Sequence, residues 1–224
     1  MSACRCDPQL DILPEQQESQ YFLYRILESH QRKLSYCRIT GLTEEGKKLE
    51  NIVIPDEING LIVEDVRGPF YDSHARKIYI SKNVRWQPYA NLTSVATYDY
   101  KVLFCRYECS KWSIGEWSSL NRYVSIVAED NYKAYRRNYK IANLNYFYNY
   151  EGSGNGGIHF IDDLDEGETL VVIPPEPIRE GYRFQGWYRD EACTEPFDLT
   201  TYVRKDTDGI LSLYAGWEEN QAKK

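Results

Sequence analysis

Short apolar triplets recur along the first part of the chain at nearly constant intervals. Ile52-Val53-Ile54 is repeated 26 residues later as Ile78-Tyr79-Ile80. In each triplet the two outer residues point to one face and the middle residue points to the other, which predicts a short β-strand. Later triplets that fit the pattern lie at 95–97 or 102–104, at 124–126 and at 146–148.

The spacing of the triplets predicts how these strands are arranged. A single short strand with its turn cannot bury its apolar face, so successive units must stack around one continuous core. The intervals of 26, 24, 22 and 22 residues lie within or close to the period of about 20–29 residues that leucine-rich repeats have. We therefore predict a mainly β protein that begins with a short solenoid of parallel strands. The number of rungs stays open, because the middle copy is degenerate.

The charge of the chain changes at a glycine-rich stretch, residues 152–157, that is typical of a turn and not of a regular element. Residues 1–150 carry 20 basic and 18 acidic side chains, whereas residues 151–224 carry 7 basic and 16 acidic ones. A composition shift at a flexible stretch indicates a domain boundary nearby. Before the first repeat, residues 7–20 are polar and contain two prolines, which predicts a disordered tether.

These features divide the chain into four predicted segments. They are a flexible tether at 1–20, a leucine-rich-repeat domain at 21–145, a second domain at 146–218 and a tail at 219–224.

The first repeats resemble a known family. Ile52-Val53-Ile54-Pro55 is followed by Ile58-Asn59-Gly60 and Val63, and Ala134-Tyr135 lies near the end of the array. These phrases resemble the opening and closing phrases of the BspA-like leucine-rich repeats of bacterial surface proteins. The phenylalanine and the cysteine of a usual rung are only partly kept, at Phe70 and Cys105. The resemblance covers residues 21–145 and implies a binding solenoid.

The second domain resembles the Listeria–Bacteroides repeat, also called the internalin B-type repeat. Gly181–Tyr188 reads GYRFQGWY, and Pro196-Phe197-Asp198 and Leu213-Tyr214-Ala215-Gly216-Trp217 follow it in the family's order. Upstream landmarks of the same family are Asn155-Gly156-Gly157, Pro174, Pro177, Arg179 and Gly181. The resemblance implies a small α+β module of the β-grasp type on a bacterial surface protein.

The residues of this segment also favour a compact module without reference to any family. A domain of about 70 residues is marginally stable and needs large side chains in its core. The aromatic residues at 182, 184, 187, 197 and 217 supply them. Strict alternation along a strand predicts Tyr182, Phe184 and Gly186 on one face, with Gln185 and Trp187 on the other.

Composition narrows the class of protein. The 224 residues include 20 Tyr but 7 Phe and 1 Met, which favours β-structure. A net charge of −7 argues against a nucleic-acid binder. No apolar run approaches the roughly 20 residues that cross a bilayer. Three histidines leave little material for acid–base or metal chemistry.

Candidate chemical motifs are weak, so we expect no enzyme, no cofactor and no metal site. Residues 152–157 lack the Lys-Ser/Thr of a phosphate loop, and residues 158–161 predict a strand where a helix is needed. Asp72-Ser73-His74 holds the residue types of a hydrolytic triad, but triad members meet from distant positions. The acidic run at 162–168 lacks the spacing of a calcium loop and is typical of a solvated loop. A hydrolase is the least favoured hypothesis.

The cysteines leave three alternatives open. Cys105 and Cys109 would form a disulfide only across a turn, and single cysteines could instead fill apolar repeat positions. Ser2-Ala3-Cys4, followed by a polar tether, is similar to a bacterial lipoprotein junction, which makes Cys4 a candidate lipid anchor. An ordinary chain start explains the same residues. The sequon Asn91-Leu92-Thr93 carries no information in a bacterial protein.

The favoured hypothesis is a non-catalytic bacterial cell-surface protein. The solenoid would bind a host or bacterial surface protein or a glycan, and the second domain would act as a spacer. Binding to a membrane would occur only through Cys4. Trp112 and Trp117 are candidate ligand-binding residues, although capping of the solenoid core explains them as well. If they stack on sugar rings, the alternative is a carbohydrate-binding surface lipoprotein.

Overall fold

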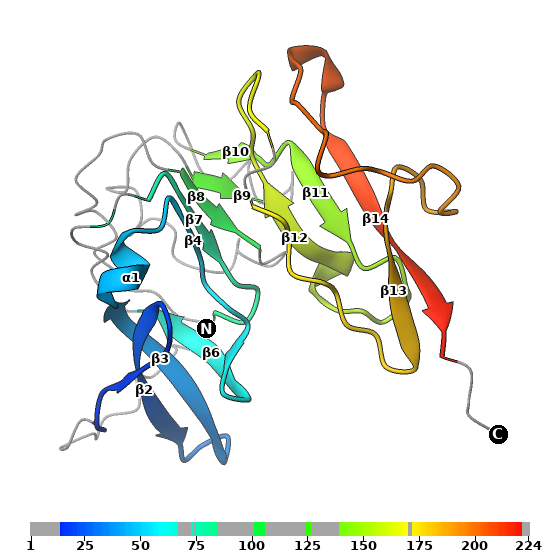
Figure 1. Cartoon of the computed structure of the whole chain (residues 1–224). Coiled ribbons are helices and arrows are strands. Elements are labelled where there is room, and N and C mark those ends of the chain that lie inside the picture. Colours follow the sequence, from blue (N-terminus) through cyan, green and yellow to red (C-terminus); the bar gives the residue numbers. More distant parts are fainter. Residues whose placement is uncertain are drawn as a thin grey trace, which may run out of the picture. The chain divides into compact units, whose positions relative to one another are not determined.

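The computed structural model describes residues 14–66, 73, 75–84, 101–105, 124–126, 139–169 and 172–220. The chain divides into two compact units (Figure 1). The described residues of unit 1 are 14–66, 73, 75–76 and 83–84, and those of unit 2 are 77–82 and the described residues from 101 onward. The described part of the chain is mainly β, as the sequence predicts.

Unit 1 is built around a long antiparallel hairpin. β2 (Phe22–Ser29) and β3 (Leu34–Leu42) pair over their whole length, and β6 (Leu61–Val66) pairs with β3 in parallel. Apolar side chains along these strands, among them Leu27 and Ile39, are buried and form the core of the unit. β1 (Gln17–Glu18) lies beside β2, β5 (Glu57–Ile58) lies beside β6, and β4 (Asn51–Val53) also belongs to this unit.

The end of the predicted tether has regular structure. Gln17 and Glu18 form β1, which pairs antiparallel with Tyr24 and Leu23. The prediction of a disordered segment up to residue 20 is therefore wrong for these two residues, because an open edge of β2 offers their backbone hydrogen bonds. Residues 1–13 lie outside the described residues.

A single helical turn follows β3. In α1 (Glu44–Lys47) the Thr43 hydroxyl oxygen accepts a hydrogen bond from the amide of Gly46 at 3.0 Å, which caps the helix. Gly46 lies so close to the backbone of Tyr21 that a Cβ atom would be 2.1 Å from its carbonyl oxygen. Among the described residues no helix has the length and apolar character that crossing a membrane requires.

Unit 2 contains a parallel sheet formed by the repeated triplets. β7 (Lys77–Ile80), β8 (Lys101–Phe104), β9 (Val124–Ile126) and β10 (Tyr139–Ile141) pair in chain order, and Ile78, Val102 and Val124 are in register. This order confirms the strands expected at 78–80, 102–104 and 124–126. Parallel neighbours in chain order are what a stacked repeat requires, and the leucine-rich-repeat assignment of 21–145 stays a prediction.

The next strand of this sheet is not the one expected. Tyr139–Ile141 pairs with β9, whereas the triplet at 146–148 overlaps β11 (Leu144–Phe147) of a second sheet. The intervals alone were misleading, because an apolar alternation fits any half-buried strand. The boundary predicted at residue 145 stays a prediction.

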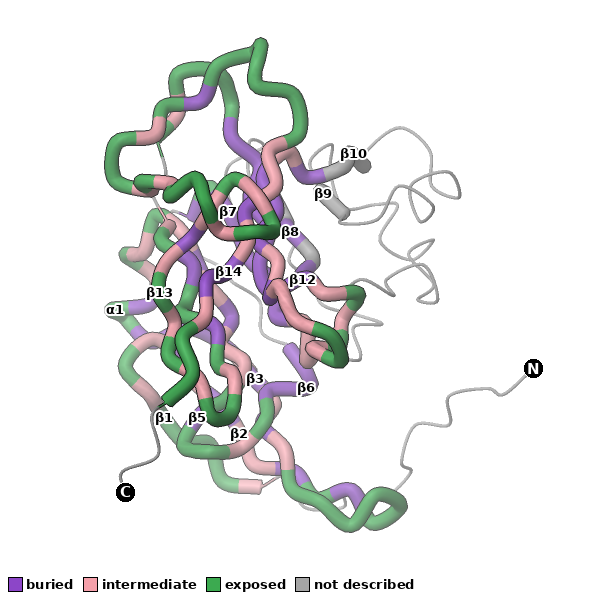
Figure 2. Tube along the Cα trace, turned by 90° about the vertical axis from the view of Figure 1, so that its right-hand side faces the viewer, coloured by how far each residue is buried: buried purple, intermediate pink, exposed green. Residues whose placement is uncertain are grey.

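The second sheet of unit 2 has four strands. β11 lies at its centre between β12 and β14, and pairs antiparallel with β12 and parallel with β14. Tyr146, Leu213 and Ala215 are fully buried along it. The other strands are β12 (Ile158–Asp162), β13 (Tyr182–Tyr188) and β14 (Leu211–Glu219), and the short 3-10 turns are η4 (Asn155–Gly157) and η5 (Asp206–Asp208). Figure 2 shows buried residues along strands such as β7 and β12 and mostly exposed loops.

A β-bulge in β13 corrects the predicted distribution of its side chains. The register with β14 shifts between Phe184 and Gly186, and Gly186 has φ of 120°. The extra residue brings the rings of Phe184 and Trp187 to 5.2 Å from each other. The expectation that Trp187 faces away from Phe184 is therefore wrong, because it assumed an unbroken alternation.

The loop after β13 contains a carboxylate, that of Asp190, whose protonation should lower the stability of the protein in acid. The Asp190 carboxylate accepts bonds from the amides of Thr194 and Glu195 and from the Thr194 hydroxyl at 2.8–3.1 Å. The amide of Thr194, followed by that of Glu195, lowers the pKa of Asp190. The stabilisation is complete above the ordinary carboxyl pKa of about 3.9 and is lost as pH falls through the lowered pKa.

We expect urea denaturation between pH 6 and pH 2 to show a smaller acid-induced loss of stability in Asp190→Asn than in the wild type. Asp206→Asn removes an exposed carboxyl group outside this loop and serves as the control. An identical acid-induced loss in wild type and Asp190→Asn would contradict the prediction.

Candidate functional site

Two neighbouring strands of unit 2 each begin with a buried lysine. Lys77 opens β7, Lys101 opens β8, and the two residues are partners in the parallel register. Because neighbouring parallel strands place register partners on the same face, both side chains extend in the same direction. The Lys77 side chain is 6% exposed, which is rare for a lysine unless it has a partner.

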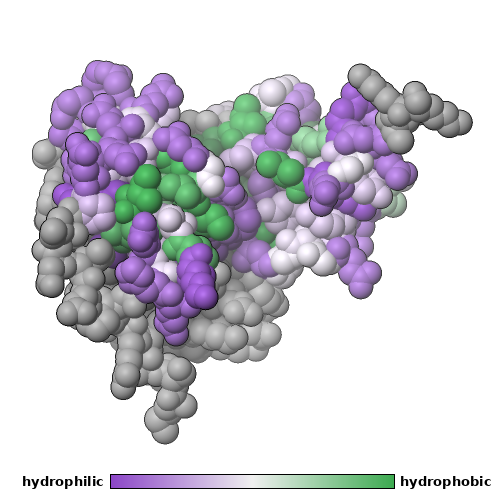
Figure 3. All heavy atoms as spheres, turned by 90° about the horizontal axis from the view of Figure 1, so that it is seen from below, coloured by the Kyte–Doolittle hydropathy of each residue, from purple (hydrophilic) through white to green (hydrophobic). Residues whose placement is uncertain are grey.

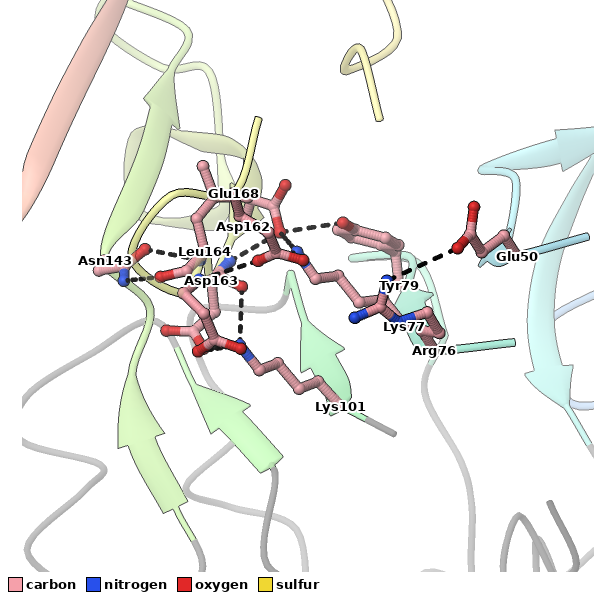
Figure 4. A network of polar contacts seen from close by, with 11 residues as sticks. Glu50, Arg76, Lys77, Tyr79, Lys101, Asn143, Asp162, Asp163, Leu164 and Glu168 are labelled. Carbon is pink, nitrogen blue, oxygen red and sulfur yellow. Dashed lines mark hydrogen bonds and ion pairs between the residues drawn. The ribbon is translucent and has the colours of Figure 1, made fainter. Parts of the chain in front are cut away.

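The partners are two adjacent aspartates at the end of another strand. β12 ends at Asp162, and Asp163 follows it at the start of the loop that leads to Glu168. Both carboxylates are buried, and Asp162 is 1% exposed. Figure 4 shows the lysines of β7 and β8 extending toward this loop. Four charged groups that are distant in the sequence therefore meet inside unit 2.

Lys77 contacts two carboxylates. Its Nζ lies 3.4 Å from Oδ1 of Asp162 and 3.1 Å from Oε2 of Glu168. The Glu168 side chain is 22% exposed, and its Oε2 also accepts the amide of Asp165 at 2.8 Å. The contact to Glu168 holds the far end of the loop against β7.

Lys101 forms a second set of contacts that is open to water. Its Nζ lies 3.1 Å from Oδ2 of Asp163 and 2.8 Å from Oδ1 of Asp165, and Asp165 is 70% exposed. Burial by itself lowers the pKa of Lys101, but the bonds to Asp165 and Asp163 outweigh burial and leave the pKa raised. Lys101 is therefore held as an ammonium ion.

The two oxygens of Asp162 have different surroundings. Besides Lys77, Oδ1 accepts the Tyr79 hydroxyl at 2.9 Å and the amide of Asp163 at 2.7 Å. Oδ2 is buried and has no hydrogen-bond partner among the described residues. Burial raises the pKa of Asp162, although the charge of Lys77 and the hydrogen bonds to Oδ1 oppose this.

Aromatic rings surround the carboxylate of Asp162. The ring of Tyr79 stacks on Phe160 with a centroid distance of 5.1 Å, and Tyr146 lies 6.0 Å from Phe160. Burial also raises the pKa of the Tyr79 and Tyr146 hydroxyls, and the Asp162 charge adds to this effect. Both phenols are therefore neutral at physiological pH.

The acidic run at 162–168 is only in part the solvated loop that the sequence predicts, since Asp165, Glu166 and Gly167 are exposed. Asp162 and Asp163 are buried and contact lysines, whereas Asp165 alone among these three is exposed. The prediction is wrong for Asp162 and Asp163, because a run of acidic residues does not reveal lysines on strands about 60 to 90 residues earlier in the chain. No group of three or more metal-ligating side chains occurs within the described residues.

The other predicted site residues are placed as follows. Trp112, Trp117, Cys4, Cys109, Asp72 and His74 lie outside the described residues. His159 is buried in β12, where its Nε2 lies 2.6 Å from the carbonyl oxygen of Pro175. Cys37 and Cys105 are buried, which fits the alternative of cysteines at apolar positions. Residues 152–157 form a turn that includes η4.

Sequence reasoning missed the lysines although a signal was present. Lys77 and Lys101 each immediately precede an apolar triplet, with the same 24-residue interval as the triplets themselves. A charged residue at a fixed repeat position indicates a ladder on one face of the stack. The acidic run that begins at Asp162-Asp163, directly after the strand predicted at 158–161, contains their partners of opposite charge.

The described surface of unit 2 carries a few exposed apolar side chains. Figure 3 shows a mainly hydrophilic surface with some apolar regions. The exposed large apolar side chains of unit 2 are Ile173, Ile178, Val203 and Ile210. Single apolar residues at the surface are ordinary in soluble proteins.

The hydroxyl of Tyr146 leads to a prediction about stability. The residue is fully buried, and its oxygen has no hydrogen-bond partner among the described residues. An unsatisfied buried hydroxyl is unfavourable, so we expect Tyr146→Phe to raise the free energy of unfolding by about 1 kcal/mol. Urea denaturation followed by tryptophan fluorescence measures the change. Tyr79→Phe removes a hydroxyl that donates to Asp162 and should be destabilising; a destabilised Tyr146→Phe variant would contradict the prediction.

Comparison with known proteins concerns the second sheet of unit 2. The family model of the Listeria-Bacteroides repeat domain matches residues 147–216. Two proteins of Evansella cellulosilytica are similar to part of this chain: a "Putative membrane protein", 38% identical over 66 residues, and a "Putative Gly-rich membrane protein", 40% identical over 67 residues. Each match covers 30% of this chain, but only 10% and 7% of the relatives. No solved structure matches significantly. The motifs of the second domain are thus confirmed, and residues 147–216 carry a Listeria–Bacteroides repeat.

Proposed function

We propose that this chain is a non-catalytic part of a bacterial cell-surface protein. Residues 147–216 match a repeat domain, and two relatives of part of this chain are named as putative membrane proteins. The sequence resemblance of residues 21–145 to BspA-like repeats supports the same class. The proposed location is extracellular and attached to the cell surface, with Cys4 as the candidate anchor.

The pairing of the buried charges carries the proposal of a structural role. Lys77 contacts Asp162 and Lys101 contacts Asp163 inside unit 2, and these two pairs join the parallel sheet to the edge of the second sheet. Buried ions in such pairs contribute more to a defined arrangement than to net stability. A site for a reaction instead needs groups that are aimed at a substrate. The arrangement therefore favours a spacer whose two sheets are held together by buried ion pairs, and it does not favour a catalyst.

The binding role belongs to residues 21–145 in this proposal. Their partner is a host or bacterial surface protein, bound by the face of the repeat array. The chain spans a small fraction of the relatives that it matches, so further binding surfaces in a longer protein fit the same proposal.

Labelling of intact cells tests the location. Antibodies raised against the purified chain should stain intact cells of the bacterium that produces it, and brief protease treatment should remove the signal. Staining that requires permeabilised cells would contradict the proposal.

A binding screen tests the role. The purified chain should bind immobilised surface or matrix proteins in a saturable manner and remain unbound on a glycan array. Glycan binding that is lost in Trp112→Ala and Trp117→Ala would instead favour the carbohydrate-binding protein.

A further inference from the structure

The amine of Lys77 and the carboxyl group of Asp162 lie next to each other in an arrangement that suits a reaction between them. Two carboxyl groups contact the same amine. Asp162 Oδ1 is 3.4 Å from Nζ of Lys77, and Glu168 Oε2 is 3.1 Å from the same nitrogen. Lys77 and Asp162 are almost completely buried. We propose that Nζ of Lys77 and Cγ of Asp162 join in an intramolecular amide bond, with the loss of one water molecule. This proposal does not depend on the proposed function.

The surroundings of Asp162 favour the attack of an amine on its carboxyl carbon. Oδ1 accepts hydrogen bonds from the Tyr79 hydroxyl at 2.9 Å and the Asp163 amide at 2.7 Å. Two donors on one oxygen stabilise the negative charge that develops there when a nucleophile adds to the carbon. Oδ2 has no hydrogen-bond partner among the described residues, so nothing described here holds the oxygen that has to leave.

Burial favours the uncharged form of the Asp162 carboxyl group. The Asp162 side chain is 1% exposed, and burial raises its pKa. The ion pair and the pair of amine and carboxylic acid contain the same atoms and differ only in the position of one proton, which is on Nζ of Lys77 in the first and on Asp162 in the second. A low-polarity environment penalises two buried ions, and the amide bond removes both charges permanently.

The reaction is balanced without any other reagent. The lone pair of Nζ attacks Cγ, and the electrons of the carbonyl bond move to Oδ1. When that double bond forms again, the bond from Cγ to Oδ2 breaks. Oδ2 leaves as water with its own proton and with the second proton of the nitrogen, which Glu168 accepts and passes on. Glu168 returns to its initial state.

The fold brings the reacting groups to a high effective concentration. Lys77 is held at the start of β7 and Asp162 at the end of β12, so the reaction is unimolecular and needs no further ordering of the chain. Well-oriented intramolecular reactions have effective molarities of about 10⁵ M or more. Amide formation, which is unfavourable in water, becomes favourable under these conditions.

Lys101 provides an internal contrast. It also contacts an aspartate, Asp163, but its second partner Asp165 is 70% exposed. The pair of Lys101 and Asp163 therefore adjoins a group that is open to water, which stabilises a charged amine, whereas Lys77 and Asp162 are almost completely buried. The proposed bond is therefore specific to Lys77.

Mass spectrometry of the purified full chain tests the proposal directly. The denatured wild-type chain should be lighter than its sequence mass by one water molecule. A protease digest should contain a branched peptide in which residues 77 and 162 are linked. The proposal would be overturned if the folded wild-type chain had its full sequence mass and residues 77 and 162 were found in two separate, unlinked peptides.

Matched variants show whether the missing water molecule comes from this bond or from another site in the chain. Lys77→Arg should have its full sequence mass, whereas the control Lys101→Arg should keep the deficit. A deficit that persists in Lys77→Arg would overturn the proposal, because water loss would then occur elsewhere. Asp162→Asn should lose one ammonia molecule in place of water.

The role of Glu168 is tested by rate. Glu168→Gln removes the proton acceptor and should slow formation of the bond by about 100-fold or more, and Glu168→Asp should restore part of the rate. Near-UV circular dichroism shows whether each variant is folded. Fast formation of the bond in folded Glu168→Gln would exclude Glu168 as the acceptor.

Discussion

Lys77→Ala is expected to be the most destabilising single change among the charged residues of unit 2. The variant leaves the carboxylate of Asp162, which is 1% exposed, without the lysine that it contacts. Removing one member of a buried ion pair costs about 3–5 kcal/mol, because the other charge stays buried without compensation. A cross-link between the two residues would increase the loss further. Urea denaturation at pH 7, followed by the fluorescence of the buried Trp187, measures the effect.

Arg183→Ala is the matched control for this experiment. Arg183 and Glu218 form an ion pair at the surface of the same unit, with both side chains more than half exposed. Such pairs contribute about 0–1 kcal/mol. The double variant Lys77→Ala/Asp162→Ala should be less destabilised than Lys77→Ala alone, because it contains no orphaned charge. Equal losses in Lys77→Ala and Arg183→Ala would show that the buried pair has no structural role.

The strands of the parallel sheet could be predicted from the sequence because their signal is local. Two outer apolar residues around a middle one at 78–80, 102–104 and 124–126 mark strands whether or not their partners are known. Assignment of 146–148 to the same stack failed, since its neighbours in the second sheet are set by β12 and β14. Periodicity identifies strands, whereas pairing depends on the whole chain.

The candidate site was beyond the same reasoning for a related cause. Asp162 and Lys77 are 85 residues apart, and nothing near either residue in the sequence marks it as buried. Composition assigns an acidic run to the surface because burying an unpaired charge is costly. That rule fails where a residue of opposite charge on another strand pairs with the carboxylate. Only the three-dimensional structure shows that such a partner is present. The repeated position of Lys77 and Lys101 was the part of the signal that the sequence contained.

The Listeria–Bacteroides repeat was predictable in its landmarks but not in its packing. The order of GYRFQGWY, FD and LYAGW identifies the region without any knowledge of structure. The bulge at Phe184–Gly186 depends on one glycine with positive φ, and it reverses the side on which Trp187 lies. A strict two-residue period cannot reveal such an irregularity.

Trp187→Ala is expected to unfold the second sheet of unit 2. The side chain is 5% exposed and lies among aromatic rings, with centroids 4.9 Å from Tyr146, 5.2 Å from Phe184 and 5.9 Å from His159. Replacement of a buried tryptophan by alanine costs about 3–5 kcal/mol, through lost burial and the cavity left behind. A loss of this size is a large fraction of the roughly 5–15 kcal/mol by which a typical domain is stable.

Near-UV circular dichroism and amide NMR spectra of Trp187→Ala should therefore lose the signals of a folded sheet at 25 °C. Trp187→Phe keeps an aromatic ring in the same place, and it should remain folded with a smaller loss of stability. The half-buried Trp217, which donates its indole N–H to the Tyr148 carbonyl oxygen at 2.6 Å, provides the comparison with a ring at the edge of the cluster. Because Trp217 has less surface to lose, Trp217→Ala should be less destabilised than Trp187→Ala. A folded Trp187→Ala variant with the stability of Trp217→Ala would mean that Trp187 is not at the centre of this core, and that the bulge at Gly186 has no consequence for packing.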